Sequence, residues 1–230
     1  MELPGKRELR EQILHQMDGR TSYVSDKDVY REIDKAILRS SHGGYGTLSE
    51  KEELRRQMFY SIRGFDVLEK YLGDSSISEI MVIGAGDGGV VRELTRYDRV
   101  RHIDLVEMDP MVVEACRAYL PENACRLDDR RVHLHYENAL RFIRRCEAKY
   151  DLIIVDSSDP FGPSEGLFTR EFYGNCYNAL KEDGIMVNQQ GSPFYAEDAH
   201  AMQRSHKRIA STFQISRVYQ AHIPTFAAGY

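Results

Sequence analysis

The first third of the chain carries apolar residues at the spacing of amphipathic helices. Within residues 26–38, for example, valine and isoleucine recur at i, i+4 and i+8, so they share one helix face. Ser25 or Asp26 is suited to cap the start of this helix. The helices predicted from this pattern are residues 6–17, 26–38 and 49–71, the last as one long helix or two short ones.

A different pattern begins at residue 80, where short apolar runs alternate with helical stretches. The strands predicted from it are residues 80–83, 101–106, 132–135, 152–155, 185–189 and 215–219. The helices predicted between them are residues 90–96, 110–119, 138–145, 169–180 and 197–211. Pro110 suits the first turn of a helix, and Gly184 suits the position after a helix end. The alternation implies βαβ units, so residues 76–230 are expected to form an α/β domain around a doubly wound, mostly parallel sheet, with residues 1–75 as a helical cap or lid.

Composition and charge narrow the classes of protein that this pattern allows. A length of 230 residues with 42% hydrophobic residues fits one domain with a small appendage. The formal net charge of -5 argues against nucleic acid as the main partner, because phosphate binding requires a basic face. No apolar run reaches the roughly 20 residues of a membrane span, and no signal peptide is visible, so a cytoplasmic protein is expected. None of the four cysteines has a partner at zinc-ligand spacing, so no metal site is expected.

A glycine-rich loop, GAGDGG at residues 84–89, directly follows the first strand of the α/β segment. Gly84, Gly86 and Gly88 allow the backbone to turn tightly and a ligand to approach the main chain. Glu107, about 20 residues further at a strand end, is placed to accept hydrogen bonds from ribose hydroxyls. Asp87 inside the loop would repel a pyrophosphate, whereas it suits a cationic sulfonium nucleoside. The loop therefore favours a Rossmann-like fold of the S-adenosylmethionine-dependent methyltransferase type over a dinucleotide-binding one.

A second acidic stretch, DSSDPFGP at residues 156–163, follows the strand at residues 152–155. Ligands of open α/β sheets bind at the carboxyl ends of the strands, so Asp156 and Asp159 are expected near the glycine loop. Asp, Ser and Pro are also common turn residues, and a turn without a ligand is the alternative interpretation.

Residues 83–195 resemble the spermidine synthase (polyamine aminopropyltransferase) family. The matching pieces are GAGDGG, DLVEMDP, YDLIIVDSSDPFGPSEGLFTREFY and LKEDGIMVNQQGSPF, and IPTFAAG near the end resembles the family's IPTYPSG. The run DSSDP-x-GP-x-E-x-LF is highly specific for this family.

The resemblance implies a role for each matching position. Asp87 and Asp156 would flank the aminopropyl arm of decarboxylated S-adenosylmethionine, and Asp156 would also act as the base toward the attacking amine. Asp159 would bind the far ammonium group of a diamine, and Gln189 would contact the substrate. Glu107 would hold the ribose.

Elementary acid–base chemistry agrees with these roles. A primary amine has a pKa of about 10.4, so it arrives protonated, and a carboxylate can take the proton as the amine attacks. Carboxylates beside the sulfonium tail also repel the carboxylate of intact S-adenosylmethionine and favour the decarboxylated form. Alignment of amine and sulfonium should supply much of the rate.

The chain departs from the family pattern in four places. Its N-terminal part is predicted to be helical rather than the family's small β domain, and the Tyr-Gln pair that precedes the family's first Rossmann strand has no clean match. Asn138 stands where the family has an aspartate that accepts from the adenine amino group, and its carbonyl oxygen could still accept there. Phe226 replaces a tyrosine, and no closing strand follows. Residues 215–219 would then form an exposed edge strand, which a homodimer could cover.

Three functions stay open on the sequence alone. The first is aminopropyl transfer from decarboxylated S-adenosylmethionine to an amine such as putrescine. The second is a small-molecule methyltransferase or cyclase that uses intact S-adenosylmethionine. The third is a partner subunit without catalytic activity.

Overall fold

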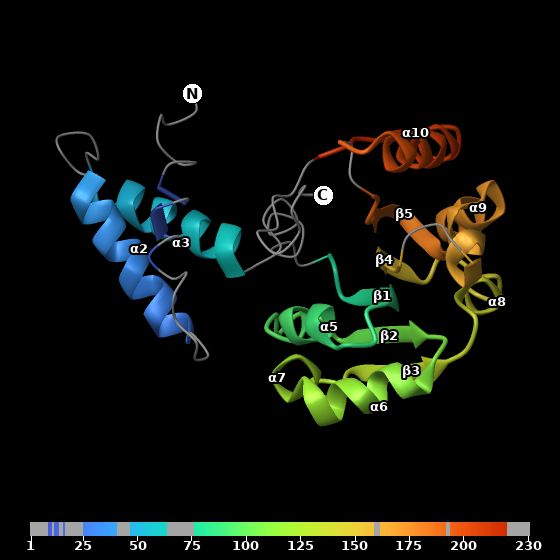
Figure 1. The fold of residues 1–230 in the computed structure, drawn as a ribbon, viewed down its shortest axis with the longest axis horizontal. Helices are drawn as coiled ribbons and strands as arrows, with labels where there is room; N and C mark the ends of the chain where they lie inside the picture. The colour runs from blue at the N-terminus through green and yellow to red at the C-terminus, as the bar shows by residue number, and fades with distance from the viewer. Residues whose placement is uncertain are drawn as a thin grey trace. The chain divides into compact units, whose positions relative to one another are not determined.

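The computed structural model describes residues 9–10, 12–13, 16, 25–40, 47–63, 76–158, 162–191 and 194–219 (Figure 1). The chain separates into two compact units, residues 1–74 and 75–230. Among the described residues, no helix combines the length and the apolarity that crossing a membrane requires. The lid role expected for the first unit stays a prediction.

The first unit is helical, and two helices of it are described over their full length. Helix α2 spans Asp26–Ser40 and helix α3 spans Leu48–Arg63. The Ser25 hydroxyl accepts from Asp28 N at 3.3 Å, and the Asp28 carboxylate accepts in return from Ser25 N, which forms a capping box. Ser25, rather than Asp26, therefore caps α2. The apolar faces of α2 and α3 pack together in a core that includes Val29, Ile33 and Met58.

The second unit is built on a five-stranded, fully parallel sheet in the order β3-β2-β1-β4-β5. The strands are β1 (Glu79–Gly84), β2 (His102–Glu107), β3 (Val132–Tyr136), β4 (Tyr150–Asp156) and β5 (Leu180–Asn188). Five of the six predicted strands are therefore present, and the order places β1 at the centre, between β2 and β4. The α/β fold with a doubly wound parallel sheet is confirmed.

Helices connect the strands, as the βαβ pattern predicts (Figure 1). The connections contain α5 (Gly89–Leu94), α6 (Pro110–Tyr119), α7 (Pro121–Ala124), α8 (Ala139–Ile143), η2 (Gly162–Phe168) and α9 (Arg170–Ala179), whereas α10 (Ala196–Ala210) follows β5. Pro110 occupies the first turn of α6, where its missing N–H costs nothing, and the Asp109 side chain caps this helix through Met111 N.

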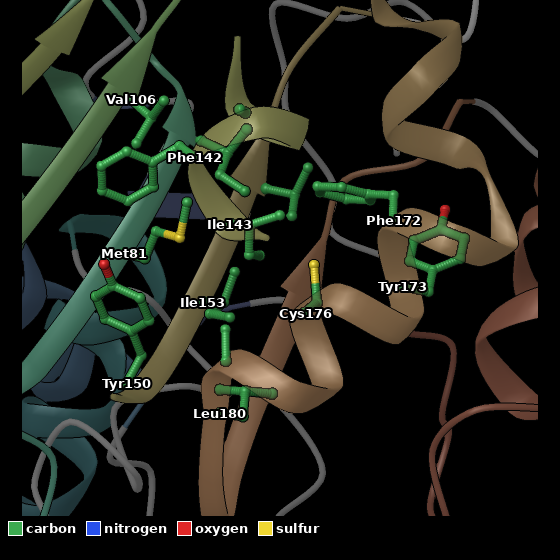
Figure 2. Close-up of a cluster of buried hydrophobic side chains, with 14 residues drawn as sticks. Met81, Val106, Phe142, Ile143, Tyr150, Ile153, Phe172, Tyr173, Cys176 and Leu180 are labelled. Carbon is green, nitrogen blue, oxygen red and sulfur yellow. The ribbon is translucent and has the colours of Figure 1, made fainter. Parts of the chain in front are cut away.

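One hydrophobic core of the second unit lies between the central strands and helices α8 and α9. Figure 2 shows two side chains of α8, Phe142 and Ile143, close to Met81 of β1 and Ile153 of β4, in a cluster that also includes residues of α9. All four side chains are buried. This packing holds the central strands rigidly, so that the residues at their carboxyl ends are held in fixed positions.

Two expectations from the sequence are wrong. Residues 215–219 do not form a strand, and Ile215 is 77% exposed, since none of the described strands pairs with it. The expectation of a homodimer that covers this strand therefore loses its basis. Gly184 does not follow a helix end, since α9 ends at Ala179 and Gly184 lies within β5. The β4–β5 register jumps from Leu180 to Ile185, so Gly184 belongs to a bulge that interrupts the strand.

Candidate active site

The glycine loop begins where β1 and β4 end side by side. Gly84 pairs with Asp156 in the register, and Ala85 N donates to the Asp156 carbonyl oxygen at 2.9 Å. Gly84 has φ +78°, and a β-carbon on it would lie 2.1 Å from that oxygen. Only glycine meets both conditions, so the sequence signal at Gly84 reflects direct contact between the loop and the end of β4.

Glu107 ends β2 and lies against the same loop. Its Oε1 accepts from Asp109 N at 3.0 Å, and a β-carbon on Gly86 would lie 2.8 Å from its Oε2. Gly86 is therefore small because the carboxylate occupies the space beside it. This arrangement holds a hydrogen-bond acceptor next to the loop, as a ribose requires.

Asp87 projects from the middle of the loop and accepts two hydrogen bonds from neutral donors. Its Oδ1 accepts from Gly89 N at 3.3 Å, and its Oδ2 accepts from Asn123 Nδ2 at 3.0 Å. Gly88, at φ +85°, turns the backbone into α5. Asn123 lies in α7 and belongs to no sequence motif, so it was not predicted as a site residue.

Among the predicted site residues, Asp156 has the clearest shift in the pKa of its side chain. Burial raises the pKa of its carboxyl group above the ordinary value, and the negative charge of Asp87 raises it further. The two carboxylates are thus close enough to repel each other. A site with two such groups favours a cationic ligand, because a positive charge relieves the repulsion.

Asn138 stands directly before α8 and caps it. Its Oδ1 accepts from Leu140 N at 2.9 Å and from Arg141 N at 3.3 Å. From the sequence, this oxygen was expected to be able to accept from the adenine amino group, whereas in the structure it caps the helix. The side chain can therefore offer a ligand its amide N–H groups.

Two predicted substrate residues follow β4 and β5. Gln189 continues the ladder past the end of β5, because its N donates to Val155 O at 3.0 Å, and its side chain is exposed. Asp159 lies outside the described residues, so its place stays a prediction. On either side of the undescribed residues 159–161, the hydroxyls of Ser158 and Ser164 form a hydrogen bond at 2.9 Å.

The parallel sheet, the glycine turn after β1 and the acidic end of β4 define a class, the Rossmann-like α/β proteins of the methyltransferase type. Within this class, residues 72–230 match the model of the spermine/spermidine synthase domain. The chain belongs to the spermine/spermidine synthase family.

Curated relatives and solved structures agree with this membership. The polyamine aminopropyltransferase of Clostridium perfringens (strain 13 / Type A) is 63% identical over 155 residues, which are 67% of this chain and 55% of that protein. The polyamine aminopropyltransferase of Clostridium botulinum (strain Eklund 17B / Type B) is 57% identical over 220 residues, which are 91% of this chain and 78% of that protein. The chain thus spans about 55% of the length of the C. perfringens relative.

Two solved structures share the fold. A spermidine synthase in complex with the transition state analogue AdoDATO has a TM-score of 0.64 and 39% identity, with 66% of this chain and 52% of that chain covered. The spermidine synthase of Thermotoga maritima has a TM-score of 0.60 and 37% identity, with 66% of this chain and 50% of that chain covered. The similarity therefore rests on sequence as well as on fold.

Proposed function

We propose that the chain is an aminopropyltransferase that uses decarboxylated S-adenosylmethionine as donor and a small amine, such as putrescine, as acceptor. The observation that carries the proposal is the pair of neighbouring carboxylates, Asp87 and Asp156, at the ends of adjacent strands. Family membership and the AdoDATO complex of a structural neighbour support it.

Each side chain has a role that fits its surroundings. Asp87 binds the cationic tail of the donor, and Glu107 accepts from the ribose hydroxyls beside Gly86. Asp156 takes a proton from the acceptor amine, because its raised pKa makes it a better base than an ordinary aspartate. Gln189 contacts the acceptor, and Asp159 binds its far ammonium group.

The donor supplies an electrophilic carbon next to its sulfonium sulfur: the amine nitrogen forms a bond to this carbon, the carbon–sulfur bond breaks, and neutral methylthioadenosine leaves. The protein contributes alignment and charge rather than covalent chemistry. The carboxylate pair also sets the donor specificity, since the extra carboxylate of intact S-adenosylmethionine would meet two like charges.

Calorimetric titration with decarboxylated and with intact S-adenosylmethionine tests the proposal, followed by product analysis with putrescine. We expect a clear preference for the decarboxylated form and release of methylthioadenosine with spermidine. A preference for the intact form with release of S-adenosylhomocysteine would instead indicate a methyltransferase. If the chain shows no turnover with any amine, either alone or together with a catalytic homologue, it would instead be a partner subunit without activity.

A further inference from the structure

Asn123 of α7 is connected to the donor-binding loop, although 36 residues separate it from Asp87. Its Nδ2 donates to Asp87 Oδ2 at 3.0 Å. A β-carbon on Gly88 would lie 3.0 Å from the Asn123 carbonyl oxygen, so the backbone of α7 lies directly on the loop. The contact thus joins two elements that already touch.

Arg92 fixes which way the Asn123 amide faces. Its Nη1 donates to Asn123 Oδ1 at 2.8 Å, and its Nε donates to Glu93 Oε1 at 2.9 Å. A flipped amide would direct its NH₂ group at the guanidinium and its oxygen at the carboxylate of Asp87, and both contacts would be repulsive. The chemistry of the neighbours therefore determines the orientation, which directs an N–H at Asp87.

The hydrogen bonds from Arg92 to Asn123 and from Asn123 to Asp87 orient the Asp87 carboxylate without neutralising its charge. The two hydrogen bonds that the structure gives to the carboxylate come from an amide side chain and a backbone N–H, and both donors are neutral. The positive charge of Arg92 is held one amide group away, on the far side of Asn123. A direct arginine contact would instead cancel the charge that a cationic ligand needs.

We propose that Asn123 is a positioning residue, which holds the Asp87 carboxylate aimed at the cationic aminopropyl tail of the donor. The proposal rests on the proposed function and deepens it. Methylthioadenosine offers a sharp comparison, because it shares the nucleoside with the donor but lacks the aminopropyl cation. A residue that serves the cation will therefore affect the donor and spare methylthioadenosine.

Binding of both ligands to the full chain, measured by calorimetry, tests the proposal on Asn123→Leu, which removes both hydrogen bonds at similar volume. Loss of a hydrogen bond to a charged group predicts about ten-fold weaker binding of decarboxylated S-adenosylmethionine. Affinity for methylthioadenosine should stay within about two-fold of the wild type. Glu122→Ala is the matched control, since Glu122 is the exposed neighbour on α7, and it should leave both affinities unchanged.

Equal loss of both ligands would overturn the proposal, because Asn123 would then only support the shape of the loop. Unchanged binding of both would overturn it as well. A wild-type chain that binds neither ligand would overturn the proposed function, and this inference with it. If Asn123→Leu does not fold, Arg92→Gln provides the test, since it frees the amide to rotate and should weaken donor binding selectively by about three-fold.

Discussion

Ionisation of Asp156 is unfavourable to the folded state, because the carboxyl group is buried and lies near the negative charge of Asp87. Its raised pKa means that the folded protein binds this proton more tightly than the unfolded chain does. At neutral pH the charged carboxylate therefore lowers stability, and a drop in pH through the raised pKa relieves this. The proposed chemistry thus needs a carboxylate at a position where an uncharged side chain would make the folded state more stable.

Asp156→Asn should separate activity from stability. We expect aminopropyl transfer to fall by about 10³-fold, because the base is lost, while the melting temperature rises by about 2 °C as the repulsion from Asp87 disappears. Steady-state kinetics and thermal unfolding at neutral pH measure the two effects. Asp183→Asn removes an exposed carboxylate of β5 and should change neither. Near-normal turnover by Asp156→Asn would contradict the assignment of the base.

At the scale of elements, the side chain that caps helix α8 is also the one expected, from the resemblance to the family, to contact the nucleoside. The oxygen of Asn138 caps the helix, so it serves the fold first. An aspartate there would have two oxygens, one for the cap and one for the adenine amino group. The departure from the family pattern at this position thus acquires a physical meaning, because asparagine keeps the cap and gives up the second acceptor.

Two substitutions of Asn138 test whether its side chain serves the helix cap, the adenine contact or both. Asn138→Ala should lower the free energy of unfolding by about 1 kcal/mol through loss of the cap. Asn138→Asp should keep the cap, which a negative charge at a helix N-terminus favours, and should bind methylthioadenosine about three-fold more tightly. Chemical denaturation and calorimetry measure these outcomes. Weaker binding by Asn138→Asp would show that the nucleobase accepts from the Asn138 amide instead.

At the scale of the whole molecule, a buried carboxylate ties β2 to the start of β4. Asp104 has a side chain only 3% exposed, and it accepts from Lys149 Nζ at 2.6 Å and from the Tyr150 hydroxyl at 2.7 Å. Burial alone would raise its pKa, but the hydrogen bonds from Lys149, Tyr150, His135 and His102 outweigh burial and hold the pKa well below its usual range. The stability that Asp104 contributes is therefore complete above about pH 4 and is lost as the pH falls through the folded-state value.

Asp104→Asn should accordingly destabilise the protein in a pH-dependent way. We expect a loss of about 3 kcal/mol near neutral pH, since the partners of a buried charge lose their counterion. The difference from the wild type should shrink as the pH falls below about 4. Urea denaturation at several pH values measures it. Asp128→Asn, at an exposed pair with Arg117, should stay within about 0.5 kcal/mol of the wild type, and an equal effect at both positions would contradict the role of burial.

The sequence predicted what depends on local pattern. Strand periodicity located the central strands, and the glycine loop located the close contact at Gly84. The acidic strand end placed Asp156 beside Asp87. Each of these signals lies within a few consecutive residues, so chain order alone determines which groups meet at the edge of the sheet.

Contacts between distant segments could not be predicted in this way. The bond from Asn123 to Asp87 depends on how closely α7 approaches the loop, and nothing near Asn123 in the sequence indicates it. Residues 215–219 have the alternation of a strand, but a strand forms only where a neighbour supplies hydrogen bonds. Gly184 matched a helix end locally, whereas the register of β5 with β4 decided its place.

The bond from Ala85 N to the Asp156 carbonyl has a consequence for experiment. It joins the glycine loop to Asp156 through a backbone amide, whose proton exchanges with solvent only when the ends of β1 and β4 separate. The exchange rate of this one proton, followed by NMR in deuterated water, would report on the assembly of the site before any substrate is added. Substrates that together contact the glycine loop and Asp156 should slow the exchange of this proton.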